Sequence, residues 1–306
     1  KLVVATNEEE RTRLAELFRR GGANGLQGLR QLPRGGWRSI EPQVDGLEAL
    51  FVPEEGIVDY RQVISVMSRL LRERDVKIVT EAEVCRLERT ADRWVAKTKA
   101  NAEFQASFLV NCGGLHCDRV ARMAGEGSST RIVPFRGEYF RLRPDREGLV
   151  RNLVYPVPDP VYPFLGVHFT RLILGGIECG PNAVLAASRE GYDWSRINLR
   201  DLAEVAAFPG FWRFVHKHRH EALREITASW SKGRFCLGLQ KLVPDLRPED
   251  LMPGGSGVRA QAMDPTGALV QDFAIGRGTQ SLHLLNAPSP AATASLAIGR
   301  HIVGLL

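Results

Sequence analysis

The stretch FLVNCGGLHCDRVARMAG (108–125) decides how this sequence folds, because a buried strand in it runs through two glycines directly into a helix. At such a junction Gly113 and Gly114 let the backbone approach a phosphate or a flat ring, and the helix N-terminus favours negative charge. A plain tight turn in an α/β sheet would explain the same two glycines. Asp118 and Arg119 are predicted to cap and brace the helix.

Strands and helices alternate around this stretch, as they do in an open α/β sheet. An apolar strand comes first, Asn7 is predicted to cap a helix that stops at glycines, and Asp59 is predicted to cap a second helix. The apolar positions of that second helix recur at helical spacing: Val63, Ile64, Met67, Leu70 and Leu71. Two strands that look antiparallel precede residue 108.

The middle of the chain, roughly 131–250, has a different character. Several short strands separated by proline and glycine turns predict a mainly antiparallel sheet, followed by a charged helical stretch over about 199–230. From about residue 254 the α/β pattern returns and ends in a final helix. Because the α/β signal lies on both sides of the antiparallel block, we expect two domains that the chain crosses more than once.

The composition is that of an ordinary globular protein, with 44% hydrophobic and 25% charged residues in a chain of 306. The net charge of +6 favours anionic ligands, but no Lys/Arg run is clustered like a nucleic-acid arm, so no nucleic-acid partner is expected. The five cysteines form no CxxC pair and indicate free thiols in a reducing compartment. Neither a transmembrane run nor a targeting segment is visible.

Three residues stand out as candidates for chemistry. Arg136 in VPFRGEYF and Arg259 in GSGVRAQAMD lie in apolar, strand-like settings, where a guanidinium needs an acidic partner. Each forms either an internal salt bridge, with Glu138 or Asp264 as the partner, or a bidentate clamp on a substrate carboxylate. His168 in FLGVHFT is either a hydrogen-bonded core histidine or a general base.

Other patterns argue against particular sites. His216 and His220 are four residues apart, but without HExxH they are predicted to form a solvated face, and no metal site is expected. The GxGxxG pattern that most strongly indicates a bound dinucleotide is absent. The glycines of GGANGLQG (21–28) follow a helix and precede an irregular stretch, which is the wrong setting for a phosphate cradle.

Several segments, in order along essentially the whole chain, resemble the L-2-hydroxyglutarate dehydrogenase/oxidase family. This family belongs to the flavoproteins that resemble D-amino-acid and glycine oxidases. The segments include GIVDYRQV (56–63), CGGLHCDR (112–119), RIVPFRGEYF (131–140), GPNAVLAASREGY (180–192) and NAPSPAATASLAIG (286–299). The combination of PFRGEYF, GPNAVLA and NAPSPAAT is specific to that family.

The resemblance implies an FAD enzyme that oxidises L-2-hydroxyglutarate to 2-oxoglutarate, with hydride passing from the substrate C2 to flavin N5. It implies an α/β (α+β) fold, in which an incomplete FAD-binding Rossmann-like domain is interleaved with a mainly antiparallel-sheet substrate domain. We therefore expect the substrate domain over residues 1–55 and 131–253, and the FAD-binding domain over 56–130 and 254–306.

The resemblance also implies roles for single residues. His168 is the expected catalytic base, Arg136 and Arg259 are the expected anchors of the two substrate carboxylates, and Tyr139 and Asn182 are further polar partners. The expected FAD-binding positions are Val84, Gly113, Gly114, Asn286, Ala287, Pro288 and Ser289. Ser289 or Thr293 is expected to cap the final helix.

Members of this family begin with a strand, GxGxxG and a helix, and that opening is missing here. The chain is therefore expected to be a fragment or a truncated form that binds FAD weakly or not at all. The alternatives are a related flavin oxidase of another 2-hydroxy or amino acid, and a non-catalytic truncated relative. The expected partners are a small dicarboxylate and a quinone or oxygen as electron acceptor, and peripheral membrane association is compatible with them. The expected location is mitochondrial in a eukaryote, and otherwise cytoplasmic or peripheral on the inner membrane.

Overall fold

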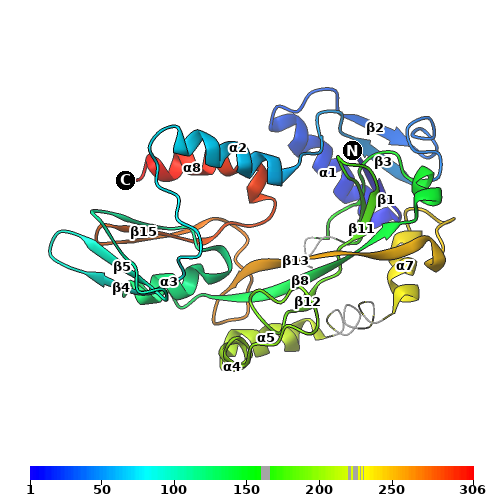
Figure 1. Cartoon of the computed structure of the whole chain (residues 1–306). Helices are drawn as coiled ribbons and strands as arrows, with labels where there is room; N and C mark the ends of the chain where they lie inside the picture. The colour runs from blue at the N-terminus through cyan, green and yellow to red at the C-terminus, as the bar shows by residue number, and fades with distance from the viewer. Residues whose placement is uncertain (160–165, 220–221, 223–226, 228, 230) are drawn as a thin grey trace. The chain divides into compact units, whose positions relative to one another are not determined.

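The computed structural model describes residues 1–159, 166–219, 222, 227, 229 and 231–306, and its chain is shared between two units (Figure 1). The first unit comprises Lys1–Ser65, Arg136–Val184 and His220–Gly257. The second comprises Val66–Phe135, Leu185–Arg219 and Val258–Leu306. The units are thus interleaved along the chain.

The sequence predicts domain boundaries after residues 55, 130 and 253. The chain passes from one unit to the other nearby, after residues 65, 135 and 257. The segment 131–253, however, is not kept together, because Leu185–Arg219 lies in the second unit. Ion pairs hold it there: Arg189 pairs with Asp118, and Arg119 pairs with Glu204 at 2.7 Å. The assignment of FAD to one unit and substrate to the other stays a prediction.

A nine-stranded, mainly antiparallel sheet forms the framework of the first unit, in the order β12-β8-β11-β10-β9-β1-β3-β2, with β13 also paired to β8. Strand β1 is parallel to β9 and antiparallel to β3, while β8, β11 and β10 pair antiparallel. The strands are β1 (Leu2–Ala5), β2 (Arg30–Pro33), β3 (Glu48–Phe51), β8 (Arg131–Leu142), β9 (Val154–Pro156), β10 (His168–Arg171), β11 (Ile177–Gly180), β12 (Val184–Leu185) and β13 (Leu251–Met263). The predicted antiparallel block is confirmed.

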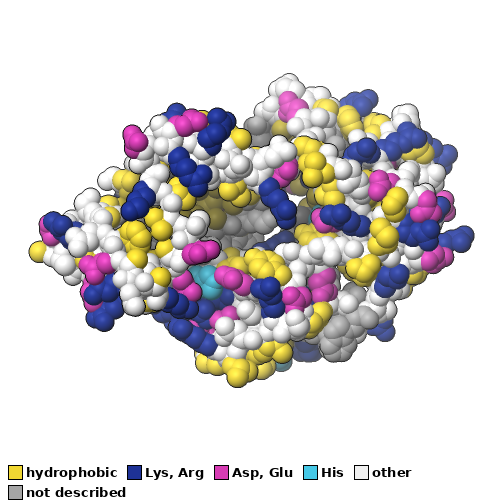
Figure 2. Space-filling view, viewed as in Figure 1, with side chains coloured by type: hydrophobic (Ala, Val, Ile, Leu, Met, Phe, Trp, Pro, Cys, Tyr) yellow, Lys and Arg dark blue, Asp and Glu magenta, His cyan; other side chains and the backbone are white. Residues whose placement is uncertain are grey.

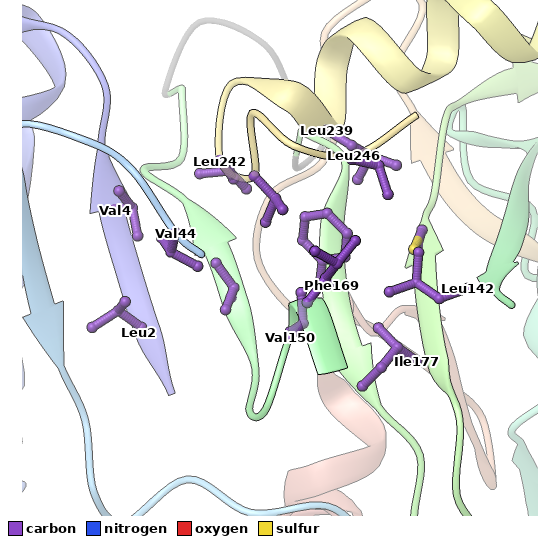
Figure 3. Close-up of a cluster of buried hydrophobic side chains, with 14 of the residues drawn as sticks. Leu2, Val4, Val44, Leu142, Val150, Phe169, Ile177, Leu239, Leu242 and Leu246 are labelled. Atoms are coloured by element: carbon purple, nitrogen blue, oxygen red, sulfur yellow. The ribbon is translucent and has the colours of Figure 1, made fainter. Parts of the chain in front are cut away.

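One face of this sheet packs against helix α7 (Lys232–Gln240) to form the main core (Figure 3). Alternate side chains of successive strands meet there with leucines of the α7 region: Leu2, Val4, Phe169, Ile177, Leu142, Leu239, Leu242 and Leu246. Phe169 and Leu239 are 0% exposed, and burial of each such side chain contributes about 1.5–3 kcal/mol. Two short 3-10 helices complete this unit, η2 (Pro144–Leu149) and η3 (Pro248–Asp250).

Helix α1 (Glu8–Ala23) covers the other face of the sheet at β1 and β3, where Leu14 packs in a second cluster. The predicted cap is confirmed, because Asn7 Oδ1 accepts a hydrogen bond from the Glu10 amide at 2.9 Å. The predicted glycine stop is confirmed at Gly25, which follows the C-cap Asn24, although the helix itself continues through Gly21 and Gly22 to Ala23. Those glycines tolerate helical backbone, and the left-handed residue that the turn needs is Gly25, with φ 86°.

The second unit contains two three-stranded sheets. In one, β15 (Ser281–Asn286) pairs in parallel with β7 (Leu109–Asn111) and antiparallel with β14 (Ala274–Gly278). The other is the antiparallel series β4 (Val84–Arg89), β5 (Trp94–Thr98) and β6 (Glu103–Ala106). Trp94 Nε1 donates to the Gln280 carbonyl at 2.8 Å and so connects the two sheets. The helices are α3 (Cys117–Met123), α4 (Leu199–Ala206), α5 (Pro209–Lys217) and α8 (Ser295–Val303), with the 3-10 helices η1 (Gly114–His116) and η4 (Ala291–Ala294).

Helix α2 (Tyr60–Arg72) crosses the division between the units at Ser65. Its predicted cap is confirmed, because Asp59 Oδ1 accepts from the Arg61 amide at 2.9 Å. Its apolar residues have the expected helical spacing, yet none of its residues is buried, and Ile64 is 62% exposed. Helical periodicity therefore predicted the element but not its burial.

All five cysteines are free thiols, as the spacing predicted. Cys85 and Cys112 are exposed, and the other three are buried. Burial raises the pKa of Cys117 and of Cys236 to about 11, so both thiols stay protonated and unreactive near neutral pH.

Candidate active site

One face of the first unit's sheet brings two predicted site residues together. His168 on β10 lies opposite Gly180 on β11. Along the next pair of strands, Cys179 on β11 lies opposite Phe140 on β8, so that Gly180 comes opposite Tyr139 on β8. Cross-strand partners share a face. His168, Gly180 and Tyr139 thus form a row across three strands. Since Cys179 and Phe140 belong to the core and side chains alternate along a strand, this row points away from the core.

Gly180 makes close packing within the row possible. Its φ is 142°, and a β-carbon there would lie 2.9 Å from the Glu138 carbonyl oxygen and 3.0 Å from Cδ1 of Tyr139. A larger residue would therefore push β11 away from β8. The glycine lets the Tyr139 ring lie against the β11 backbone.

His168 is 8% exposed, and its described contacts include a hydrogen bond and a ring stack. Its Nδ1 is 3.1 Å from the Gly166 carbonyl oxygen, and its ring stacks on Tyr155 with centroids 3.9 Å apart and an interplanar angle of 19°. Because a carbonyl can only accept, Nδ1 carries a proton, and the neutral tautomer with this hydrogen bond has its lone pair on Nε2. That tautomer is the one a base at Nε2 requires. Its catalytic role stays a prediction.

Tyr155 is the less obvious member of this pair. Its hydroxyl lies 3.4 Å from Oγ1 of Thr170 on the neighbouring strand. Burial raises the pKa of Tyr155, so the phenol remains neutral. A neutral, hydrogen-bonded ring is a fixed surface for the imidazole to stack on.

Arg136 and Asn182 form a separate cluster around Glu138. Arg136 is 1% exposed, and its Nη2 donates to Glu138 Oε1 at 3.0 Å. Glu138 Oε2 accepts from Asn182 Nδ2 at 3.0 Å and from the Ser229 hydroxyl. The internal salt bridge that the sequence left open is therefore present. Because Arg136 and Glu138 are two residues apart on β8, they share a face, and Tyr139 lies on the opposite one.

Arg259 lies on β13 in the second unit and is partly buried. Asp264, its alternative partner, accepts hydrogen bonds from the amides of Thr266 at 2.8 Å and Ala268 at 3.0 Å within its own turn. The carboxylate-binding role of Arg259 stays a prediction. His216 lies on α5, while its neighbour at position 220 is outside the described residues. Within the described part of the chain, no three metal-ligating side chains gather.

The side chain of Asn111 holds both ends of the glycine turn that follows β7. The Gly113 amide donates to Asn111 Oδ1 at 3.0 Å, and Asn111 Nδ2 donates to the Cys117 carbonyl at 2.8 Å. Gly114 has φ 54°, and a β-carbon there would have no heavy atom within 4 Å. The turn therefore presents a left-handed glycine to open space, where a ligand can approach the backbone.

The helix after this turn is braced as predicted, and Asp118 binds its N-terminus from within the first turn. The residue before α3 is His116, which makes no side-chain cap. Asp118 Oδ1 accepts from the Arg119 amide at 2.9 Å, while Arg189 binds the same carboxylate, with Nη2 2.9 Å from Oδ2. The bracing by Arg119 is confirmed, since its Nε donates to Glu204 at 3.0 Å.

The end of β15 contains a buried amide. Asn286 is 3% exposed, and its Nδ2 donates to the carbonyls of Val270 at 3.0 Å and Asp272 at 2.8 Å. Its Oδ1 is buried and has no partner among the described residues. Of the next three predicted cofactor positions, two are half-buried and the last is exposed: Ala287, Pro288 and Ser289.

The predicted cap of the final helix is wrong. Helix α8 follows Ala294 without a side-chain cap, and η4 follows Pro290 likewise. The Thr293 hydroxyl donates to the Pro290 carbonyl at 2.8 Å and is therefore occupied within the preceding turn. Ser289 lies outside both helices.

The second unit fits a flavin nucleotide. Three polar atoms on β15 are buried without a partner among the described residues: Ser281 Oγ, His283 Nε2 and Asn286 Oδ1. Gly114 offers an open backbone at the end of the neighbouring strand β7. Val84 and His116 line one cavity of about 1320 Å³ within this unit, larger than the roughly 300–1,000 Å³ of a usual ligand pocket. Gly113, Gly114, Val84 and the 286–289 corner stay the predicted FAD positions, and of these Val84 is the one that lines the cavity.

The residues that hold these candidates in place could not be found from the sequence. Tyr155 contacts His168 only because of the register between two strands. Arg189 contacts Asp118 across 71 positions of sequence, and Asn111 reaches both ends of the glycine turn. The one available signal for Arg189 is its place in GPNAVLAASREGY, a segment that carried the family resemblance.

Comparison with known proteins identifies the class. Residues 1–305 match the family described as FAD dependent oxidoreductase. The fold is shared with L-α-glycerophosphate oxidase from Mycoplasma pneumoniae, with TM-score 0.76 and 21% identity over 100% of this chain and 72% of that one. It is also shared with L-proline dehydrogenase from P. horikoshii, with TM-score 0.62 and 16% identity over 93% of this chain and 66% of that one. The chain belongs to this family of FAD-dependent oxidoreductases, and the α/β fold with Rossmann-like and substrate parts is confirmed.

Within that class, its family is that of the L-2-hydroxyglutarate dehydrogenases. The chain is 44% identical to the L-2-hydroxyglutarate dehydrogenase of Indibacter alkaliphilus, over 98% of this chain and 75% of the relative. It is 42% identical to that of Escherichia coli K12, over 99% and 72%, and 40% identical to the mitochondrial protein of Mus musculus, over 99% and 68%. The resemblance drawn from the motifs is confirmed.

Proposed function

We propose that this chain oxidises L-2-hydroxyglutarate to 2-oxoglutarate with FAD. The observation that carries the proposal is the row of His168, Gly180 and Tyr139, in a chain 44% identical to a dehydrogenase of that name. The alternative of a flavin oxidase with another substrate is less favoured, because the similar curated proteins across bacteria and animals share one name.

Oxidation of the alcohol removes a proton from the hydroxyl and a hydride from C2, and bound FAD supplies the two-electron acceptor. His168 Nε2 accepts the hydroxyl proton. The Gly166 carbonyl, 3.1 Å from Nδ1, stabilises the imidazolium that results, and the stacked Tyr155 ring adds a cation–π attraction. Tyr139, in the same row, hydrogen-bonds the substrate oxygen.

A five-carbon dicarboxylate carries two negative charges, and Arg136 and Arg259 are the proposed anchors, with Asn182 as a polar partner. Arg136 is the weaker of the two, because it is 1% exposed, is paired with Glu138 and lies on the opposite face of β8 from Tyr139. Arg136→Ala and Arg259→Ala should each raise KM for L-2-hydroxyglutarate. An unchanged KM in either variant would remove that residue from the substrate site.

The cofactor proposal follows the second unit's geometry. Gly113, Gly114, Val84 and the 286–289 corner hold FAD, and the chain alone binds it weakly because its sequence contains no GxGxxG cradle. Purification of these 306 residues followed by an absorbance scan tests this. A yellow protein with one FAD per chain would refute the weak binding.

The substrate is tested by anaerobic flavin reduction. The chain saturated with FAD is mixed with L-2-hydroxyglutarate, D-2-hydroxyglutarate or L-lactate, and the absorbance of oxidised flavin is followed. Only L-2-hydroxyglutarate should bleach it. Equal bleaching by L-lactate or an amino acid would support the alternative oxidase, and no bleaching despite bound FAD would show a non-catalytic relative.

The electron acceptor is proposed to be a quinone or oxygen, and oxygen uptake compared with quinone reduction separates the two. On the face shown in Figure 2, basic and acidic side chains are both present. We propose no nucleic-acid partner, because no Lys/Arg run in the sequence is clustered like a nucleic-acid arm. The animal relatives carry "mitochondrial" in their names. We place the chain in mitochondria for a eukaryotic source, and in the cytoplasm or on the inner membrane otherwise. Among the described helices, none has the length and apolar character to cross a bilayer.

A further inference from the structure

A buried arginine of the second unit contacts the glycine turn directly. Arg189 is 3% exposed and Asp118 is 5% exposed. Both terminal nitrogens of Arg189 bind the Asp118 carboxylate, with Nη2 2.9 Å from Oδ2. A bidentate pair fixes the plane of the guanidinium. From that position Nη1 also donates to the Leu115 carbonyl at 2.6 Å, and Leu115 directly follows Gly114.

Arg189 is itself held at both ends. Its backbone amide donates to Asp201 Oδ2 at 2.7 Å, and Nη2 lies 3.3 Å from Glu204 Oε2. Burial alone would raise the pKa of Asp118, but the hydrogen bonds and charge of Arg189 lower that pKa below its usual value. Asp118 is thus ionised at neutral pH and balances the charge of Arg189. What Arg189 contributes to the turn is therefore a fixed hydrogen bond and not a free positive charge.

The glycine turn has few side-chain restraints. Asn111 fixes its two ends, at the Gly113 amide and the Cys117 carbonyl, but does not reach the middle. In the middle, Gly114 has φ 54° and open space beside it, and backbone hydrogen bonds of η1 hold the Gly113 carbonyl, from His116 at 2.9 Å, and the Gly114 carbonyl, from Cys117. Neither of these bonds engages the Leu115 carbonyl, and glycine has more backbone freedom to lose than any other residue. The hydrogen bond from Arg189 to Leu115 restrains that part of the turn.

We propose that Arg189 is a positioning residue for FAD: by holding the Leu115 carbonyl it keeps the Gly113–Gly114 backbone in the conformation that accepts the cofactor. The inference rests on the proposed cofactor site. A preorganised turn binds more tightly, because the cost of ordering it is met in the free protein. Loss of the contact should therefore weaken FAD binding more than it weakens the fold.

Arg189→Lys tests this. Lysine keeps a positive charge beside Asp118, but its single ammonium cannot bind both carboxylate oxygens of Asp118 and also donate to the Leu115 carbonyl. The matched control is Arg196→Lys. Arg196 lies in the same segment and pairs with Asp193 at 3.3 Å, but its side chain is 63% exposed. FAD affinity is measured by flavin fluorescence on the full chain. Hydrogen exchange over residues 113–117 and the thermal unfolding midpoint are measured on the FAD-free chain.

Arg189→Lys should weaken FAD binding about tenfold, the size expected for one net hydrogen bond, and should speed exchange over 113–117. Arg196→Lys should do neither. A lower unfolding midpoint in Arg189→Lys, with FAD affinity and exchange unchanged, would reduce Arg189 to a stabilising residue and overturn the proposal. A wild-type chain that binds no FAD would agree with the missing GxGxxG cradle, and the exchange rates would then decide. Faster exchange over 113–117 in Arg189→Lys alone would support positioning of the turn, and unchanged exchange would overturn it.

Discussion

His168→Asn should separate proton transfer from structure at the candidate site. An asparagine places its Nδ2 close to the position of the histidine Nδ1, so it can still donate to the Gly166 carbonyl that is now 3.1 Å away. It has no atom at the position of Nε2, the nitrogen to which we assign the proton transfer. The variant therefore keeps the structural hydrogen bond and loses the base.

The two losses differ in size. Removal of a general base costs about 10²–10⁴-fold in rate, which is about 2.7–5.4 kcal/mol of transition-state stabilisation. The structural loss is mainly the stack on Tyr155, with centroids 3.9 Å apart, and such a pair contributes about 0.5–1.5 kcal/mol. The melting temperature should fall by only a few degrees. The variant should be folded and nearly inactive.

The assay is rapid anaerobic mixing of the FAD-saturated chain with L-2-hydroxyglutarate, followed by flavin absorbance. Tyr155→Phe is the matched control, because it keeps the ring under His168 and removes only the hydroxyl 3.4 Å from Thr170. That control should reduce flavin within about threefold of wild type. A His168→Asn rate within the same range, at a slightly lower melting temperature, would refute the base and leave His168 as a hydrogen-bonded core histidine.

Three further predictions follow from charge and packing. Glu138→Gln should lower the free energy of unfolding by about 3–5 kcal/mol in urea denaturation, because the 1%-exposed Arg136 loses a charged partner 3.0 Å away; a loss under about 1 kcal/mol would contradict this. The folded-state pKa of Asp118 is lowered, so its contribution to stability is present above the unfolded pKa and lost as pH falls through the folded pKa. The free energy of unfolding of Asp118→Asn should therefore decline less steeply below about pH 5 than that of the wild type. Equal slopes for the two proteins over that pH range would argue against the ion pair of Asp118 with Arg189. Gly180→Ala should lower the free energy of unfolding by about 1–3 kcal/mol and slow flavin reduction, because φ is 142° and the new β-carbon would lie 2.9 Å from the Glu138 carbonyl oxygen. Gly56→Ala is the control, because a β-carbon there would have no heavy atom within 4 Å. Equal effects at both glycines would contradict the close approach of β11 to β8.

Local signals predicted the elements well where no distant partner competes for the residue. Asn7 and Asp59 cap helices as expected, because each side chain is used by the nearest backbone amides. Thr293 does not, because its hydroxyl donates to a carbonyl of its own turn. Asp118 divides its carboxylate between the Arg119 amide of α3 and the distant Arg189. A capping sequence states what a side chain can do, and tertiary contacts decide what it does.

Single candidate residues could be named from the sequence, but their arrangement could not. Alternation within PFRGEYF already places Arg136 and Tyr139 on opposite faces of a strand. Which face is the core depends on register, since a shift of one residue would exchange the two faces. The row of Tyr139 with His168, and the pair of Arg136 with Glu138, are consequences of pairing between strands that the sequence does not encode locally.

The interleaving of the two units has a consequence for biosynthesis. The first unit's core joins Val4 on β1 to Leu239 on α7, roughly 235 residues later in the chain. At about 5–20 residues per second, a ribosome needs roughly 10–50 s between making the two. Throughout that interval the apolar side of β1 has no native partner from α7. A nascent chain stopped before α7 should therefore be a substrate for chaperones, and the first unit should mature only late in translation.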